Sequence, residues 1–257
     1  MASTETSAEG QCFQEDNYQY NMGYKNIGKC LIINNKHFLD MNARYGTEKD
    51  ERKLKEAFGS LGFLVQVEND LSSDGMRQIL QTVSREDHSE MASFVCVILS
   101  HGEQGLIYGT DREVKIRELT TLISAMNCPT LRGKPKLFFI QACRGDELDS
   151  GIEADSVTEE CLEITEIPEE DFLCAHSTSE GYFAWRSPVF GSVFITRLCE
   201  MLNQNGRDLE IASILTRVNH QVALKFESNT PSDPSSHRKK QMPCFISKLT
   251  KELYLHK

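Results

Sequence analysis

The sequence predicts an α/β fold, in which a mostly parallel sheet of about six strands is flanked by helices on both faces. Short apolar runs that are typical of strands alternate along the chain with longer segments whose apolar residues recur at helical spacing. The strand-like runs are continuously apolar, as expected of parallel strands that are buried on both faces. A chain of 257 residues with 39% hydrophobic residues is long enough to bury such a sheet in one large core.

The first half of the chain supplies four strands and three helices in alternation. Apolar runs predict strands over residues 29–33, 63–67, 94–99 and 137–141. Helical spacing predicts helices over residues 47–61, 71–83 and 116–126. Because connections between parallel strands are short and right-handed, this order favours a parallel sheet with helices on both sides.

The second half completes the same fold. We expect a fifth strand over residues 172–175, helices over 194–203 and 209–226, and a last strand over 244–247. The acidic stretch that precedes the fifth strand therefore interrupts one fold instead of separating two domains.

The negative charge is concentrated in that stretch. The net charge is −10, and residues 146–171 hold twelve acidic residues and no Lys or Arg. Elsewhere 26 acidic residues are balanced by 28 basic ones, so the body is nearly neutral. This distribution argues against general nucleic-acid binding and predicts a solvated linker over residues 146–171.

The nine cysteines indicate reduced thiols. Their number is odd, they show no CxxC spacing, and several lie in apolar runs, for example Cys96, Cys174 and Cys199. No group of cysteines and histidines has the spacing of a zinc motif, so we expect no metal and no other cofactor.

The ends and the hydropathy of the chain predict a protein of the cytoplasm. Residues 1–20 are polar and are expected to be a short disordered leader. No stretch approaches the roughly 20 apolar residues that span a bilayer, and no signal sequence opens the chain. We therefore expect no membrane association. A nuclear location is an alternative that the sequence does not exclude.

A histidine and a cysteine follow two of the predicted strands. His101 lies two residues after the strand over 94–99, and Cys143 lies two residues after the strand over 137–141. Either residue alone would more often be structural. Because parallel strands deliver their following loops to one edge of a sheet, the two side chains are expected to meet there. A thiol attacks carbonyl carbon as the thiolate, and histidine can take its proton and return one to the leaving amine. The pair therefore predicts a cysteine nucleophile with a histidine partner.

Several motifs in this order resemble those of the caspases, and of their executioner branch in particular. The pattern Gln-Ala-Cys-Arg-Gly with an upstream histidine is a known caspase signature. The resemblance runs from about residue 20 to residue 257 and is carried by Ile32-Ile33-Asn34-Asn35, Ser100-His101-Gly102-Glu103, Gln141-Ala142-Cys143-Arg144-Gly145, Ile214-Leu215-Thr216-Arg217-Val218-Asn219 and Leu249-Thr250-Lys251-Glu252-Leu253-Tyr254. It implies the caspase fold and an endopeptidase that cleaves proteins after aspartate through a thioester acyl-enzyme, with an executioner role in apoptosis.

The resemblance also assigns the parts of the site. The backbone N–H groups of Gly102 and Cys143 correspond to the family's oxyanion donors, and the histidine is oriented by a backbone carbonyl, here expected near Asn42. Arg44, Gln141 and Arg186 correspond to the pocket for the aspartate side chain. Two guanidinium groups can hold one carboxylate by charge-assisted hydrogen bonds, so cleavage after Glu should be poor.

The neighbouring subsites depart from the executioner pattern. Phe183 and Trp185 should form an apolar wall for the residue before the aspartate. Val193 stands where a tryptophan is usual, and residues 230–236 lack the family's phenylalanines. The preference of executioners for Asp-Glu-Val-Asp is therefore expected to be loosened.

The acidic linker contains a candidate processing site. Ile152-Glu153-Ala154-Asp155 is followed by a small residue, Ser156, which suits cleavage after Asp155. We expect a zymogen that is cut into a large-subunit part, residues 21–155, and a small-subunit part, residues 156–257. Asp16 is a weaker candidate for removal of the leader.

The resemblance implies several partners. The apolar strand near residues 242–248 would meet its twofold mate, which gives a homodimer, or a heterotetramer of large and small subunits after processing. Initiator caspases would be the activators, and inhibitor-of-apoptosis proteins would be further ligands.

Two other functions are compatible with the fold. One is a catalytically silent regulator, which is disfavoured because the nucleophile, the base and both pocket arginines are present. The other is a peptidase of the metacaspase type with specificity for basic residues, which should line its pocket with Asp or Glu instead of Arg44 and Arg186.

Overall fold

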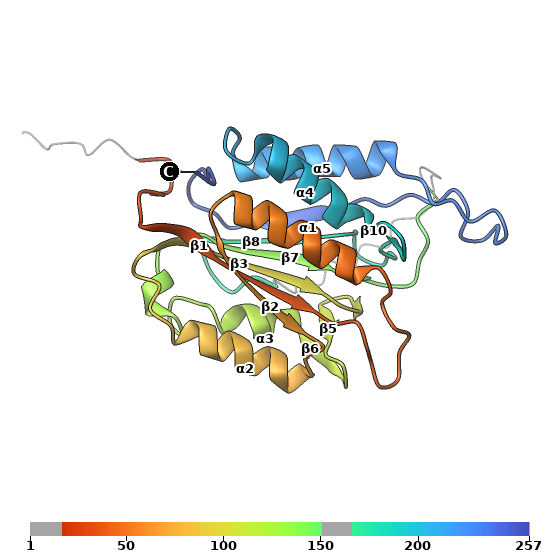
Figure 1. Ribbon diagram of the computed structural model, residues 1–257, viewed down its shortest axis with the longest axis horizontal. Coiled ribbons are helices and arrows are strands. Elements are labelled where there is room, and N and C mark those ends of the chain that lie inside the picture. Colours follow the sequence, from red (N-terminus) through yellow and green to blue (C-terminus); the bar gives the residue numbers. More distant parts are fainter. Residues whose placement is uncertain (1–16, 151–165, 257) are drawn as a thin grey trace, which may run out of the picture.

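The computed structural model describes residues 17–150 and 166–256, and its centre is a six-stranded sheet (Figure 1). The strand order is β11-β8-β7-β3-β1-β2; five strands are parallel, and β11 pairs antiparallel with β8. The bounds are β1 (Asn26–Asn34), β2 (Leu64–Asn69), β3 (Met91–Leu99), β7 (Lys136–Gln141), β8 (Phe172–His176) and β11 (Cys244–Ser247). The predicted six-stranded, mostly parallel sheet is confirmed.

Helices cover both faces of this sheet (Figure 1). One layer consists of α1 (Thr47–Ser60), α4 (Val193–Asn205) and α5 (Ile211–Lys225). The other consists of α2 (Ser73–Ser84) and α3 (Ile116–Thr121). A short 3₁₀ turn, η1 (Pro129–Leu131), precedes β7.

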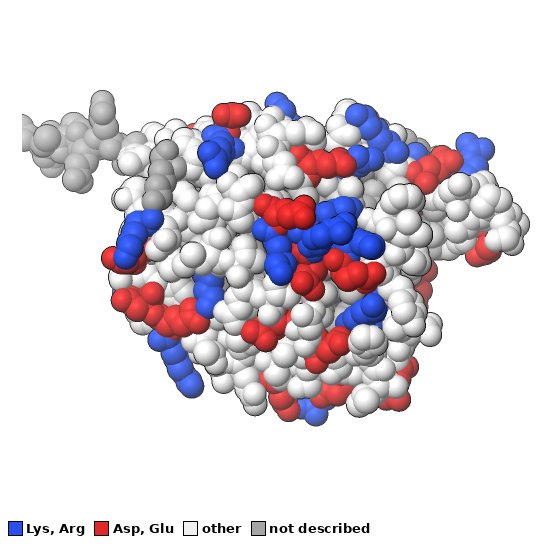
Figure 2. Space-filling view, in the orientation of Figure 1, with Lys and Arg blue, Asp and Glu red and all other residues white. Residues whose placement is uncertain are grey.

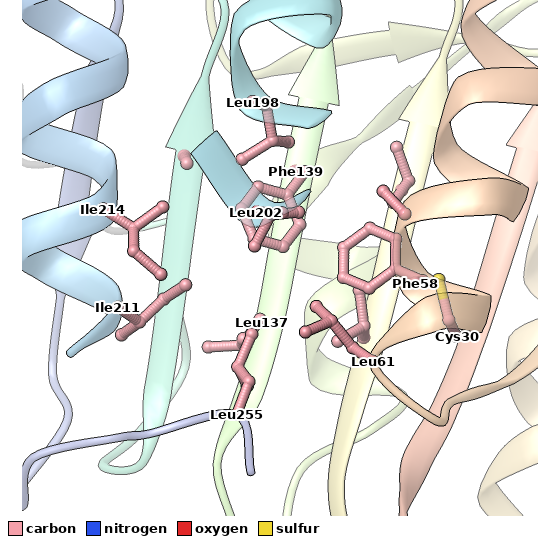
Figure 3. Packing of buried hydrophobic residues seen from close by; sticks show 14 of the residues in the cluster. Cys30, Phe58, Leu61, Leu137, Phe139, Leu198, Leu202, Ile211, Ile214 and Leu255 are labelled. Carbon is pink, nitrogen blue, oxygen red and sulfur yellow. The ribbon is translucent and has the colours of Figure 1, made fainter. Parts of the chain in front are cut away.

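The central strands contribute side chains to two hydrophobic cores, one on each face of the sheet. In β3, Val95 and Val97 face the layer of α1, α4 and α5, whereas Phe94 and Cys96 face that of α2 and α3. Figure 3 shows the first core, in which Phe58 of α1 and Leu198 and Leu202 of α4 lie over Leu137 and Phe139 of β7. Fully burying one such side chain is worth about 1.5–3 kcal/mol, so strands that are buried on both faces require continuous apolar runs.

The helix predicted over residues 116–126 is shorter in the structure, and this part of the prediction is wrong. Helix α3 ends at Thr121. The side-chain hydroxyls of its last two residues, Thr120 and Thr121, donate hydrogen bonds to the backbone carbonyl of Arg117 at 3.1 and 2.6 Å. Such local side-chain bonds compete with helical geometry, and the chain continues through turns up to Asn127.

Two small sheets lie beyond what the periodicity predicted. One joins β4 (Gly102–Glu103), β5 (Leu106–Tyr108) and β6 (Glu113–Lys115), and the other joins β9 (Arg186–Ser187) and β10 (Gly191–Ser192). Strands of two or three residues are too short to show an alternating pattern. Both nevertheless matter, because they flank the loops that follow β3 and β8.

The two ends of the described chain are fastened together. Tyr20 N–H donates to the Glu252 carbonyl at 3.0 Å, and Glu252 N–H donates to the Tyr18 carbonyl at 2.7 Å. The buried Tyr20 hydroxyl also donates to Asp171 at 2.5 Å. The last residues of the expected leader thus contact the body. Asp16 and the rest of the leader lie outside the described residues.

The surface of the body carries charges of both signs. Figure 2 shows basic and acidic side chains interspersed over the viewed face, in keeping with the near neutrality expected outside the acidic linker. No helix in the described ranges combines the length and apolar character that crossing a bilayer requires.

Candidate active site

His101 and Cys143 follow neighbouring strands of the sheet. Strands β3 and β7 are paired in parallel, and their last residues, Leu99 and Gln141, are register partners. His101 and Cys143 each come two residues later, and both line one small cavity at the carboxyl edge of the sheet. The structure thus brings the two residues together where the sequence predicted.

Two glycines allow the surrounding loops to approach closely. A Cβ atom on Gly102 would lie 2.9 Å from the Ala142 Cβ and 2.8 Å from the Leu106 carbonyl oxygen. At Gly145, where φ is +152°, a Cβ would lie 2.2 Å from the Gly181 carbonyl oxygen. Any larger residue would force these loops apart, and with them the groups around the thiol.

The imidazole of His101 is oriented by the main chain. Its Nε2 lies 2.8 Å from the carbonyl oxygen of Asn42, and its ring packs against Phe38 with 4.6 Å between centroids. Because a carbonyl only accepts, Nε2 carries the proton and Nδ1 is left as the base. Burial lowers the pKa of His101, and the charges of Arg44 and Arg186 lower it further against the opposing effect of the Asn42 bond. The ring is therefore neutral at pH 7.

The thiol of Cys143 is half-buried and is also in its neutral form. Its sulfur accepts a hydrogen bond from Ala184 N–H at 3.5 Å. Burial raises the pKa of Cys143, and this effect outweighs the lowering by the Ala184 bond and by the charges of Arg44 and Arg186. In the described part of the chain no hydrogen bond joins this thiol to the imidazole of His101. Catalytic hydrogen bonds are often loose before substrate binds.

The cavity beside the thiol contains a buried cation. Arg44 is 0% exposed; its Nη1 donates to the Asn35 carbonyl at 3.0 Å and to the Thr47 hydroxyl at 3.1 Å. Among the described residues, its Nε and Nη2 have no acceptor. Burial, followed by the charge of Arg186, lowers the pKa of Arg44 to about 9, so the group stays charged at neutral pH. Asp50 partly offsets this charge, but a buried guanidinium with two unsatisfied nitrogens is costly, so the arrangement favours a bound anion.

Gln141 and Arg186 complete the lining. Gln141 is buried at the end of β7, and its Oε1 likewise has no partner in the described ranges. Arg186 begins β9, and its Nε donates to the Tyr45 carbonyl at 3.1 Å. The cavity is about 80 Å³ and includes no Asp or Glu in its lining. It is therefore small and positively charged.

The two aromatic residues of the predicted apolar wall line two different, adjoining cavities. Phe183 lines it, whereas Trp185 lines a larger adjoining groove of about 630 Å³. Their rings meet edge to face with centroids 5.3 Å apart. Val193 and Thr230, at the two positions that depart from the executioner pattern, both line the groove.

Some groups that build the site left no signal in the sequence. The Ala184 N–H that contacts the thiol and the Tyr45 carbonyl that fixes Arg186 belong to the backbone and have no residue signature. The buried Asp50 of α1 accepts from Ser192 N–H at 2.8 Å and so ties β10 to α1. A single acidic residue on a helix, as Asp50 is, ordinarily indicates a solvated face. Asp155 lies outside the described residues.

Comparison with known proteins identifies the family. Residues 27–254 match the model of the caspase domain. The chain is 53% identical to caspase-7 of Gallus gallus over 247 residues, which cover 92% of this chain and 80% of the relative. It is 49% identical to caspase-3 of Bos taurus over 239 residues, 91% of this chain and 86% of the relative, and 50% identical to caspase-3 of Mus musculus over 241 residues, 92% and 87%. With its small cationic pocket beside a cysteine and a histidine, the chain belongs to the caspase family, in which it is an executioner caspase of the caspase-3 and caspase-7 type, an aspartate-specific cysteine protease of apoptosis.

Proposed function

We propose that Cys143 is the nucleophile and His101 the acid–base partner of this protease, and that Arg44, Gln141 and Arg186 hold the side chain of the substrate aspartate. The single observation that carries this proposal is the fully buried guanidinium of Arg44 next to the thiol, two of whose nitrogen atoms have no partner in residues 17–150 and 166–256. A carboxylate of the substrate would supply the missing acceptors. Its methylene and carboxylate suit a cavity of about 80 Å³, in which the longer glutamate would be misplaced.

The reaction begins from a neutral pair. Nδ1 of His101 takes the thiol proton as the sulfur of Cys143 attacks the carbonyl carbon of the substrate aspartate. The backbone N–H groups of Gly102 and Cys143 are the proposed donors to the oxyanion; within the described ranges, the N–H of Cys143 is not engaged in any hydrogen bond. The imidazolium then gives its proton to the leaving amine, and a thioester remains. His101 next activates water, which hydrolyses the thioester and frees the thiol.

The residues before the aspartate would bind in the larger groove. Phe183 and Trp185 stand where the pocket meets the groove and supply apolar contacts for the preceding residue. Because Val193 and Thr230 offer little aromatic surface there, selection of the more distant residues should be broad.

The test of the catalytic assignment is covalent labelling. An aspartyl fluoromethyl ketone should label the processed enzyme at one thiol in a burst, and Cys143→Ala should abolish the labelling. Cys96→Ala, which removes a fully buried thiol of β3, is the matched control and should label normally. Peptides that end in Asp should be cleaved far faster than matched peptides that end in Asn, Glu or Arg. Equal rates on Asp and Arg peptides would refute the assignment of the pocket.

Maturation is proposed to follow cleavage after Asp155, with an initiator caspase as the activator. The cut would separate residues 21–155 from residues 156–257, whose nearest described strands, β7 and β8, are paired in the sheet. Removal of the leader after Asp16 is a second proposed cleavage. An Asp155→Ala protein should stay a single chain or give fragments of altered size. Fragments of the same size as those of the wild-type protein would contradict the assignment of Asp155 as the cleavage site.

The proposed assembly is a homodimer that forms along β11. This strand is the last of the six in the sheet, and Met242 and Ile246 on or beside it are 43% and 38% exposed. An edge with unpaired backbone groups and exposed apolar side chains favours pairing with a second copy. Protein substrates follow from the family. Inhibitor-of-apoptosis proteins as ligands and a cytoplasmic location are further proposals.

A further inference from the structure

Three side chains that commonly bind metals converge on the α2 and α3 side of the sheet, away from the catalytic cavity. Glu166, Cys174 and His176 are all buried, and one ligand atom from each lies within 4.8 Å of the other two. None of them takes part in the proposed chemistry. We propose that Glu166, Cys174 and His176 bind one divalent transition-metal ion, for which zinc is the best fit.

The two distances from the Cys174 sulfur are close to those of a tetrahedral zinc site. Zinc bonds of about 2.0–2.3 Å place neighbouring ligand atoms about 3.4–3.6 Å apart. The Cys174 sulfur lies 3.3 Å from His176 Nε2 and 3.9 Å from a Glu166 carboxylate oxygen. His176 Nε2 and Glu166 Oε2 are in direct hydrogen-bonding contact. A metal would replace the proton between them and the proton of the thiol, and these two atoms would separate to bind it.

The chemistry of the ligands selects the kind of metal. A thiolate, an imidazole and a single carboxylate suit zinc and related transition metals, whereas calcium and magnesium prefer oxygen atoms alone. Deprotonated Cys174 and Glu166 carry two negative charges, which balance the two positive charges of the ion. With water as the fourth ligand the metal site is neutral, and the neighbouring charge of Arg144 is paired with Glu180 at 2.8 Å, so little net charge has to be desolvated.

The ligand side chains are positioned by a strand of the sheet and by hydrogen bonds to neighbouring residues. Cys174 and His176 are two residues apart on β8, so both point to the same face of the sheet. The Glu166 carbonyl accepts from the Thr120 hydroxyl of α3 at 2.6 Å. Arg144 Nη2 lies 3.4 Å from Glu166 Oε1, which leaves Oε2 for the ion. Such outer contacts orient metal ligands.

Cys244 is a candidate for a fourth ligand from the neighbouring strand, although its sulfur lies outside the group of atoms that are within 4.8 Å of one another. Cys244 of β11 is the register partner of His176, and side chains of partners in antiparallel strands lie on the same side. The Cys244 sulfur is 3.4 Å from Arg144 Nη1. Cys244 or water would complete the tetrahedron.

This inference departs from the sequence-based expectation of no metal. That expectation relied on zinc motifs, in which several ligands recur at short spacing. Here only Cys174 and His176 are close in sequence. Glu166 comes from the segment that precedes β8, and only the fold brings it to the other two.

The test is a cobalt and zinc titration of the full chain. Cys143→Ala is used as the parent, because it removes the catalytic thiol as a competing ligand and does not touch the cluster. Co²⁺ should bind at one equivalent and give sulfur-to-cobalt charge-transfer absorption, and Zn²⁺ should displace it. Adding Cys174→Ala should abolish the absorption and weaken Zn²⁺ binding by more than the roughly 10- to 100-fold loss that follows removal of an outer-shell partner.

Cys96→Ala in the same parent is the matched control. Cys96 is as fully buried as Cys174, lies on the same face of the sheet and occupies the same row two strands away, through Phe138. It should leave the absorption and the affinity unchanged. Glu166→Gln keeps the size of the side chain and should weaken Zn²⁺ binding at least tenfold, which gives a second readout if Cys174→Ala fails to fold. Absence of the absorption in the parent, or its persistence at full affinity in both cluster variants, would overturn the proposal.

Discussion

The cavity around Arg44 and the groove around Trp185 adjoin each other and share Arg186, yet they are built in opposite ways. The cavity is small, about 80 Å³, and combines a buried cation with polar atoms that have no partner among the residues described. The groove is about 630 Å³ and is lined largely by apolar and uncharged side chains. Unpaired polar atoms penalise every guest that does not satisfy them, whereas apolar contacts distinguish similar guests only weakly. One residue of the substrate should therefore be selected strictly and its neighbours loosely.

Replacing the buried cation should give the largest effect. Arg44→Met removes the partner of a buried carboxylate, and such truncations cost about 2–5 kcal/mol, so kcat/KM on an Asp peptide should fall roughly 30- to 5,000-fold. Because Nε and Nη2 of Arg44 have no acceptor within the part of the chain that the structure describes, the melting temperature should rise. Arg197→Met is the control. Arg197 lines the groove, and its Nη1 donates to Glu200 at 2.7 Å, so activity should change little. Equal losses in the two variants would contradict the comparison.

A milder change tests the shared residue. Arg186→Lys keeps the positive charge but loses the planar fork, part of which is committed to the Tyr45 carbonyl. Loss of one hydrogen bond to a charged group costs about 1.5–3 kcal/mol, so kcat/KM should fall roughly 10- to 150-fold, mainly through KM. Wild-type kinetics in this variant would show that Arg186 contributes only charge.

The smallest effect is expected in the groove. Val193→Trp adds an aromatic ring where the executioner pattern has one, and an aromatic contact is worth about 0.5–1.5 kcal/mol beyond its area. A positional-scanning peptide library should show a roughly 2- to 13-fold sharper preference at one distant position, with the preference for Asp over Asn unchanged. Val189→Trp, on an exposed valine outside the lining, should leave the library profile as it is. A changed Asp preference in Val193→Trp would mean that the two cavities are coupled.

The sheet could be predicted because its signal is local. Runs such as residues 94–99 are apolar on both faces, and their alternation with helices predicts a parallel sheet, whereas the strand order β11-β8-β7-β3-β1-β2 is seen only in the structure. The positions of His101 and Cys143 follow from the ends of these strands. Only the family resemblance could bring in Arg44 and Arg186, because they lie far apart in the sequence and a single arginine ordinarily belongs to the solvated surface.

What the sequence left out depends on contacts between distant segments. The exception is the early end of α3, which follows from local bonds of threonine hydroxyls to the helix itself. The contact of Ala184 N–H with the thiol and the convergence of Glu166 with Cys174 and His176 each join residues whose types indicate nothing in isolation. Tertiary structure alone creates these features.

The fastening of Tyr18 and Tyr20 to Glu252 makes a rearranged chain feasible. Because these two segments are adjacent, a short peptide could join the residues near both ends, and new termini could be opened between β7 and β8. Such a circular permutant would present the small-subunit strands first and the large-subunit strands last. Strands β7 and β8 would still pair in the register that joins Leu137 to Leu173. The permuted enzyme would therefore be synthesised without a covalent link between β7 and β8, so that no cleavage would be needed there.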